Sequence, residues 1–163
     1  MISDLTKIKK IRSKKEFTIS LAESCTGGMI SKYLTSISGS SLFFNGACIS
    51  YSNRMKTSLL SVPKNTIINY GAVSHETALA MAKGLKRITD SEILLSVTGV
   101  AGPSGGTARV PVGCVFFGIG SRVNKRYTFR TLKKIFREKT RLAIQKKSAE
   151  YAMYLILKEL KKI

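Results

Sequence analysis

The stretch AESCTGG at residues 22–28 places a carboxylate, two hydroxyls and a thiol just before two glycines. It follows a short, β-rich apolar segment at residues 17–22, and a helical pattern begins at residue 27. Amides at a helix N-terminus lack intrahelical acceptors and lie at the positive end of the dipole. Such a turn can hold a phosphate or a developing oxyanion. Ser24 is therefore either a helix cap or a nucleophile, and the pattern leaves both open.

A second specialised loop, TGVAGPSGGTARVPVG, occupies residues 98–113, directly after the apolar run at residues 93–97. It holds five glycines and two prolines, and long irregular loops in compact domains are usually functional. Neither loop matches the patterns GxxxxGK[ST] or GxGxxG. A phosphate-binding loop for nucleoside triphosphates is therefore not indicated.

A third candidate is YSNRMK at residues 51–56, where a predicted strand gives way to a helix. A lysine here can act as a general base if burial or a cationic neighbour lowers its pKa. Taken alone, the segment is better interpreted as an exposed strand end that carries ordinary polar residues. His75 is the only histidine and lies at a predicted helix start after Ser74, so a Ser–His–Asp triad is not indicated. Ser–Lys pairs need no histidine.

Other kinds of site are disfavoured by residue type. Cys25 lies beside a helix N-terminus, where a thiolate is favoured, but no histidine base accompanies it. One histidine and three scattered cysteines supply no set of zinc ligands, so we expect no metal and no cofactor.

The three cysteines form no CxxC, which indicates reduced thiols and a cytoplasmic location. No apolar run approaches about 18 residues, and the N-terminus lacks the apolar region of a secretory signal, so no membrane association is expected.

The net charge of +19 belongs to the two ends of the chain. Residues 1–15 hold six Lys/Arg and one acid, and residues 122–163 hold fourteen Lys/Arg and three acids. A solvated lysine-rich face is the favoured interpretation, and nucleic-acid binding is the alternative. No aromatic-interleaved stretch that would stack bases occurs among these lysines.

Periodicity predicts the element order α, β, α, β, α, α, β, β, β, α. Two strands followed directly by helices favour an α/β sandwich with a mixed sheet. Without a repeat or linker, the chain is predicted to be one domain over residues 1–163. Its helices are expected at about residues 1–15, 27–38, 54–60, 74–85 and 134–163, and its strands at 17–22, 41–53, 93–97, 112–120 and 123–130, with a hairpin turn at Ser121-Arg122 or Asn124-Lys125.

Four segments in order, at residues 22–28, 39–63, 71–82 and 96–113, resemble the C-terminal domain of the CinA (competence/damage-inducible protein) family. The resemblance covers about residues 17–120 and implies a three-layer α/β/α fold in a homo-oligomer. It implies an amidase that converts nicotinamide mononucleotide to nicotinic acid mononucleotide and ammonia, in pyridine nucleotide salvage. A molybdopterin-binding-like domain precedes this one in many relatives, so a stand-alone amidase form is expected here.

The resemblance also implies roles for individual residues. Ser24 matches the catalytic serine and Lys56 the catalytic lysine, with Tyr51 and Thr98 in support. We expect Lys56 to take the proton of Ser24 as it attacks the carboxamide, without metal or cofactor. Attack by water that Ser24 positions is the alternative. Ten further residues are expected to bind the substrate, with the oxyanion at Gly27 and Gly28 and the phosphate at Gly105, Gly106 and Thr107. The others are Thr26, Asn53, Gly102, Arg137 and Arg141.

Two departures from the family pattern bear on activity. Val110 replaces the usual lysine before PVG, with Arg109 as a substitute one residue earlier. Arg137 and Arg141 keep the spacing of two arginines in the family's tail, but the preceding Gly-Asp is missing. These departures motivate an alternative function, a catalytically impaired nucleotide-binding or regulatory module. A nucleic-acid-associated protein acting through its basic ends is the third.

Overall fold

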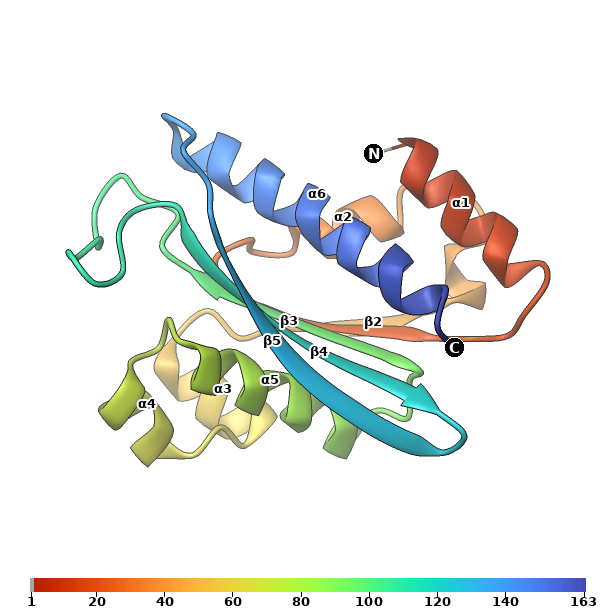
Figure 1. Cartoon of the computed structure of the whole chain (residues 1–163), viewed down its shortest axis with the longest axis horizontal. Coiled ribbons are helices and arrows are strands. Elements are labelled where there is room, and N and C mark those ends of the chain that lie inside the picture. Colours follow the sequence, from red (N-terminus) through yellow and green to blue (C-terminus); the bar gives the residue numbers. More distant parts are fainter. Residues whose placement is uncertain (1) are drawn as a thin grey trace.

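A mixed sheet of five strands forms the centre of the molecule (Figure 1). The computed structural model describes residues 2–163, with side chains from residue 4 onward. The strand order is β2-β1-β3-β4-β5; β1, β2 and β3 are parallel, and β4 and β5 run antiparallel. The mixed α/β sheet expected from the sequence is confirmed. The strands are β1 (Ile19–Glu23), β2 (Phe44–Ile49), β3 (Ile93–Gly99), β4 (Cys114–Val123) and β5 (Arg126–Ile135).

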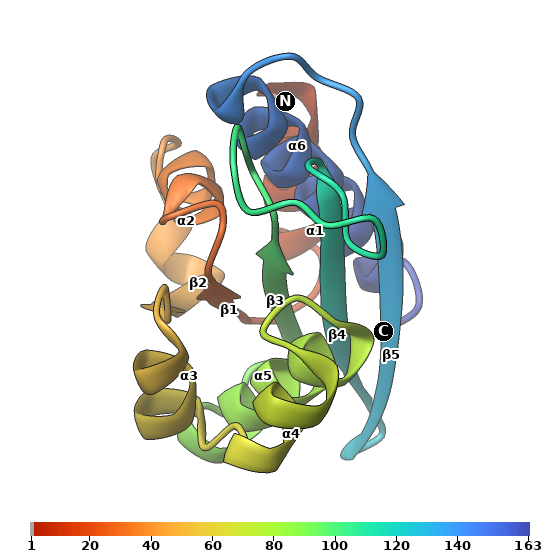
Figure 2. The same cartoon turned by 90° about the vertical axis from the view of Figure 1, so that its left-hand side faces the viewer.

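Helices cover both faces of the sheet, which makes three layers (Figures 1 and 2). One face carries α1 (Ile2–Arg12), α2 (Met29–Leu34) and α6 (Arg141–Leu160). The other carries α3 (Asn53–Leu60), α4 (Lys64–Tyr70) and α5 (His75–Ile88). A short 3-10 helix, η1 (Ser40–Leu42), precedes β2. None of the described helices is both long enough and apolar enough to cross a bilayer.

The central strands are sealed between the helical layers. All residues of β1 and all but the last of β3 are buried, which fits the mostly apolar sequences of these two strands. Leu5 and Ile8 bury the inner side of α1 in the larger apolar core. On the other face, a Cβ at Gly118 of β4 would lie 2.3 Å from the Ala78 carbonyl oxygen of α5, so glycine permits this close packing.

The end of the chain differs from the helix expected at about 134–163. Its first residues belong to β5, whose Ile135 pairs with Cys114, and α6 begins only at Arg141. Thr140 caps α6 by accepting a hydrogen bond from the Ala143 amide. The sequence did not predict the end of β5 because lysines there interrupt the apolar pattern of a strand. Charged residues are nevertheless common on an edge strand.

Other element boundaries also differ from expectation. The helix expected at 27–38 is only α2, and the strand expected at 41–53 is divided into η1 and β2. The helix α4 was missed because Pro63 was interpreted as a stop, whereas proline is also tolerated where a helix begins. Of the two hairpin turns considered, Asn124-Lys125 is confirmed, with both residues at positive φ.

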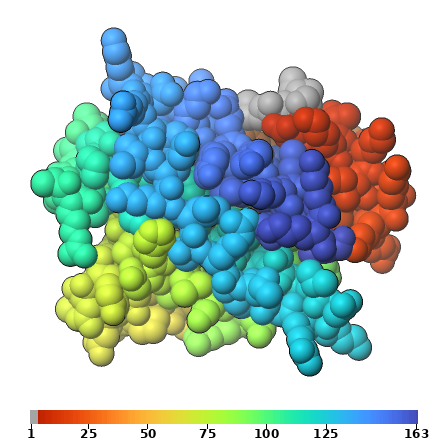
Figure 3. All heavy atoms as spheres, viewed as in Figure 1, coloured from red at the N-terminus to blue at the C-terminus, as the bar shows by residue number. Residues whose placement is uncertain are grey.

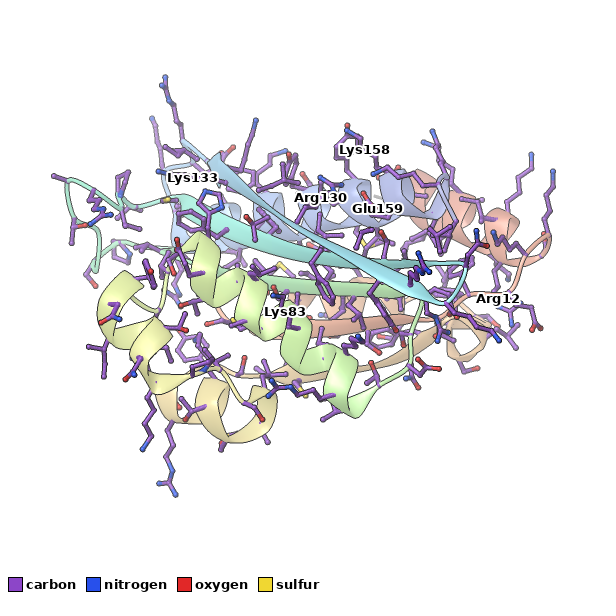
Figure 4. All side chains as sticks on the ribbon, turned by 60° about the horizontal axis from the view of Figure 1, so that its bottom comes forward. Arg12, Lys83, Arg130, Lys133, Lys158 and Glu159 are labelled. Carbon is purple, nitrogen blue, oxygen red and sulfur yellow. The ribbon has the colours of Figure 1, made fainter. Side chains whose placement is uncertain are left out.

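An ion-pair cluster fastens the end of α6 to β5. Glu159 is 2% exposed and pairs with Arg130 of β5, both of which are labelled in Figure 4. It also pairs with Lys162. A buried carboxylate is costly without partners, and of its two cations Arg130 is the one that links the helix to the edge of the sheet. The C-terminal half of α6 is therefore fixed beside α1, with which it is in contact.

Candidate active site

The carboxyl ends of the parallel strands meet at one edge of the sheet. Ser24 follows β1, Tyr51 follows β2, and Thr98 lies at the end of β3. The connection from β1 to β2 runs over one face through α2, and that from β2 to β3 over the other through α3, α4 and α5 (Figure 1). Ligands of open α/β sheets bind where the chain changes sides in this way.

A cavity of about 250 Å³ lies at this edge. Eight of the fourteen residues predicted for the site line it: Ser24, Tyr51, Asn53, Lys56, Thr98, Gly102, Gly105 and Arg141. Residues that sequence reasoning did not select complete the wall, among them Ala72, Val73 and Ser104. The main chain supplies much of this wall, so residue type gave little signal for it.

Ser24 and Lys56 are in direct contact at the bottom of the site. The Lys56 Nζ lies 3.0 Å from the Ser24 Oγ, and it donates to the carbonyl oxygens of Ser50 at 3.0 Å and Tyr51 at 3.2 Å. Both side chains are buried, Lys56 at 2% exposure and Ser24 at 7%. No carboxylate of the described residues forms an ion pair with Lys56. Burial lowers the pKa of Lys56 below its ordinary value.

These three partners suit a lysine that alternates between two protonation states. An ammonium has three N–H groups and donates to all three oxygens. A neutral amine keeps two N–H groups for the Ser50 and Tyr51 carbonyls and turns its lone pair to the Ser24 hydroxyl. The arrangement therefore places a potential general base beside a potential nucleophile.

The carboxylate of Glu23, at the end of β1, organises the turn that carries Ser24. Its side chain is fully buried. It accepts five hydrogen bonds, from the hydroxyls of Thr26 and Ser31 and from the amides of Gly28, Ile30 and Ser31, at 2.6–3.2 Å. A carboxylate at a helix N-terminus interacts favourably with the unpaired amides and the dipole. Glu23 thus caps α2.

The cap interpretation of Ser24 is therefore wrong. The N-cap position of α2 is Gly28, which has no side chain, and the capping oxygens come from Glu23. The sequence assigned no role to Glu23. The missed signal was a carboxylate at a strand end followed by hydroxyls three and eight residues later.

The turn also corrects the expected oxyanion donors. The Gly27 amide donates to the Ser24 carbonyl oxygen at 3.0 Å, and the Gly28 amide donates to Glu23. These two amides are engaged because the Glu23 carboxylate occupies the helix start. In the described part of the chain, the amides of Cys25 and Thr26 donate to no other residue.

Arg141 joins three elements across the cavity. From the first position of α6, its guanidinium donates to the Gly102 carbonyl oxygen at 2.8 Å and to the Tyr51 hydroxyl at 2.6 Å. Tyr51 is 57% exposed at the mouth of the site. Thr98 and Ala72 also line the cavity, and the Thr98 hydroxyl donates a hydrogen bond to the Ala72 carbonyl oxygen at 2.8 Å.

Six residues predicted for the site do not line the cavity: Thr26, Gly27, Gly28, Gly106, Thr107 and Arg137. The Thr107 hydroxyl instead accepts from the Val110 amide. Arg137 is exposed in the segment between β5 and α6. Arg109, the suggested substitute for the missing family lysine, lines a separate hollow beside His75.

Cys25 and His75 take no part in the contact between Ser24 and Lys56. Burial raises the pKa of the Cys25 thiol to about 12, so it is a neutral thiol rather than a thiolate nucleophile. The His75 Nδ1 lies 2.9 Å from the Thr131 hydroxyl, and its ring packs edge-on against Phe116. No group of three or more His, Cys, Asp or Glu side chains in the described part could hold a metal ion.

Comparison with known proteins finds relatives that match most of this chain. A CinA-like protein of Petrotoga mobilis is 46% identical over 144 residues, which are 88% of this chain and 34% of that protein. A CinA-like protein of Pseudothermotoga lettingae is 40% identical over 149 residues, covering 91% of this chain and 36% of that protein. The chain thus spans about a third of the length of these curated relatives.

Solved structures share the fold over nearly the whole chain. The competence/damage inducible protein CihA of Agrobacterium tumefaciens superposes with a TM-score of 0.89 at 32% identity, covering 98% of this chain and 94% of that one. The family model of the CinA C-terminal domain matches residues 4–160. The chain therefore belongs to the CinA C-terminal domain family.

Proposed function

We propose that the protein is an amidohydrolase that converts nicotinamide mononucleotide to nicotinic acid mononucleotide and ammonia. One observation carries the proposal: the Ser24 hydroxyl lies 3.0 Å from a buried lysine amine that has no carboxylate partner among the described residues. A buried amine with a lowered pKa is the base that serine needs when no histidine is nearby.

In this mechanism the neutral Lys56 accepts the Ser24 proton as Oγ bonds to the carboxamide carbon. The tetrahedral intermediate collapses when the Lys56 ammonium protonates the amide nitrogen, and ammonia leaves. Water, deprotonated by Lys56, then hydrolyses the acyl-enzyme and restores Ser24. The amide of Cys25, a residue that lines the cavity, is the proposed oxyanion donor because it donates to no other residue in the described part of the chain. Direct attack by water that Ser24 positions is the alternative first step.

The same cavity offers groups for the rest of the nucleotide. Arg141 is the cation nearest to a phosphate placed at the mouth of the site, where Tyr51 and the Gly102 loop meet it. Asn53 and Gly105 supply polar groups on the same wall. Val110 packs with Cys114 and Phe116 outside the cavity, so its replacement of the family lysine removes no charge from the cavity lining. This placement favours the enzyme over an impaired binding module.

The assay is ammonia release by the full chain from nicotinamide mononucleotide, with nicotinamide and simple amides for comparison. We expect release from the mononucleotide, and its loss in Ser24→Ala and in Lys56→Ala. Lys83→Ala, on the exposed side of α5, is the matched control and retains activity. Full activity in both site variants contradicts the mechanism. Tight mononucleotide binding without turnover supports the impaired module instead.

The homo-oligomer and the cytoplasmic location remain predictions. Light scattering of the purified chain tests the first, and fractionation of cells tests the second. Neither result bears on the contact between Ser24 and Lys56, which lies within one chain.

A further inference from the structure

A groove of about 590 Å³ runs between α1 and the C-terminal half of α6, on the face of the sheet that carries both helices. Figure 3 shows the two helices side by side on this face. The groove belongs to neither wall of the active site, and the proposed amidase chemistry makes no use of it. Its lining residues are Asp4, Lys7, Lys10, Ile11, Lys14, Tyr154, Leu157, Lys158 and Lys161.

Five exposed lysines form the walls of this α1–α6 groove. Lys7 and Lys10 lie on α1 and Lys14 shortly after its end; Lys158 lies on the facing helix α6, and Lys161 directly follows its end. Lys7 pairs with Asp4 at 3.4 Å, whereas the other four lysine side chains donate to no described residue. At a rise of about 1.5 Å per residue, neighbouring lysines of each wall, three or four residues apart, are spaced roughly 4.5–6 Å along the axis.

The floor of the groove is apolar and holds one accessible aromatic ring. Ile11 and Leu157 pack into the main core. Tyr154 is 52% exposed and stacks on Tyr151, with ring centroids 5.7 Å apart and an interplanar angle of 30°. One turn of α6 separates Tyr154 from Lys158. Folding therefore brings an aromatic ring among lysines that lie about 150 residues away in the sequence, which no local pattern revealed.

We propose that the α1–α6 groove binds single-stranded nucleic acid without sequence preference. Rows of exposed lysines, four of the five without an ion pair in the described part of the chain, follow a phosphodiester backbone, and an exposed ring between them stacks an unpaired base. The lysines neutralise charge but lack the planar fork of arginine that reads guanine edges, so sequence readout is not expected. A membrane surface fits less well, because the apolar residues form a recessed floor rather than a protruding face.

The site is separate from the proposed amidase centre. Arg141 contacts the active-site cavity from the start of α6, whereas Tyr154 and Lys158 lie on its C-terminal half. Thirteen residues of helix place Tyr154 about 20 Å along the axis from Arg141. Binding in the groove and hydrolysis in the cavity can therefore be measured and impaired independently.

Fluorescence anisotropy with a labelled 20-nucleotide oligothymidine tests the proposal on the full chain. We expect log K to fall linearly with log salt, with a slope of up to about −3.5 for five neutralised phosphates. K7Q/K10Q/K14Q is expected to weaken binding at least tenfold at low salt and to reduce the slope by about two. Tyr154→Ala is expected to weaken binding about fivefold or more with the slope unchanged.

The matched control is K64Q/K83Q/R87Q, which removes three cations from α4 and α5 on the opposite side of the sheet. These side chains are exposed and make no hydrogen bond or ion pair with a described residue. Figure 4 shows Lys83 on α5 and Lys158 on α6. We expect the control to bind within about twofold of the parent chain, because exposed charges beyond a Debye length are screened.

Several results overturn the proposal. These are no binding at 50 mM salt, equal weakening in the two triple variants, or unchanged binding in Tyr154→Ala. Preferential binding to vesicles containing anionic phospholipid assigns the groove to a membrane surface instead. Circular dichroism of each variant establishes that it is folded, and unchanged ammonia release by K7Q/K10Q/K14Q separates this site from the proposed amidase.

Discussion

Lysine occurs in two opposite environments in this molecule: Lys56 is buried at the active-site cavity, whereas the lysines of the α1–α6 groove are exposed. Lys56 is 2% exposed and bonds to two carbonyl oxygens and a hydroxyl. Lys10 and Lys14 are exposed, and their amines donate to no described residue. The buried lysine has a lowered pKa, while the exposed lysines add to the charge of an open surface.

This difference shows how solvent decides what a lysine can do. Removing water penalises the ammonium form, so the amine of Lys56 becomes a base that can accept a proton. Exposed cations keep their hydration and act over distance, and dissolved salt screens them. Experiments that alter proton affinity should therefore affect the active site, and experiments that alter ionic strength should affect the groove.

The sharpest test replaces lysine by arginine in each region. Arginine stays protonated, so Lys56→Arg keeps a cation but removes the base. We expect a loss of at least about 10³-fold in kcat for ammonia release. Lys10→Arg keeps the charge of the groove, and its oligonucleotide binding should stay within about twofold of the parent. Equal tolerance of arginine at both positions would mean that Lys56 acts only as a charge.

The dependence on pH is the second test. Catalysis needs neutral Lys56, so kcat should rise about tenfold per pH unit below the pKa of Lys56 and then level off. Burial lowers that pKa, which places the plateau below the 10.5 of an ordinary lysine. Initial rates of ammonia release between pH 5 and 10 measure the profile. A kcat that falls as pH rises would require an ammonium in the rate-limiting step.

A smaller effect is expected from Glu23→Gln, which acts on the turn rather than on the base. The amide group cannot accept all five hydrogen bonds that the carboxylate receives. We expect a loss of about 2–3 kcal/mol in the free energy of unfolding by urea. A kcat reduced about tenfold should accompany it, because Ser24 is held less firmly. Oligonucleotide binding should be unchanged.

Glu76→Gln is the control for that loss, since Glu76 is exposed in the first turn of α5. Its cost should be at most about 1 kcal/mol, the usual value of an exposed charge at a helix start. A similar small cost for Glu23→Gln would show that the buried carboxylate does not organise the turn.

The smallest effect is expected from Cys25→Ala. The thiol of Cys25 is buried, and burial raises its pKa to about 12, so it is no nucleophile. We expect kcat to change by less than about twofold, with a stability loss of about 1 kcal/mol for the smaller side chain. Steady-state kinetics and urea unfolding measure both quantities. A loss of activity comparable to that of Ser24→Ala would transfer the nucleophile to Cys25.

The sequence by itself determined the mixed α/β sheet and the strand ends that carry chemistry, whereas the roles expected for Ser24 and Lys56 were implied only by the resemblance to the CinA family. The sheet and the strand ends were predictable because apolar periodicity and turn residues act locally, and because the motifs are continuous in the chain. The residues expected at Gly106, Thr107 and Arg137 lie outside the cavity, since local sequence does not say which side of a loop faces a ligand.

Only the tertiary structure determined the environment of each functional side chain. It placed Lys56 out of water beside Ser24, and it gave the capping role to Glu23. It also brought Tyr154 and the lysines of α1 to one groove. The physical reason is the same in each case: burial, desolvation and contacts between distant segments depend on packing in three dimensions, which the spacing of residues along one chain does not encode.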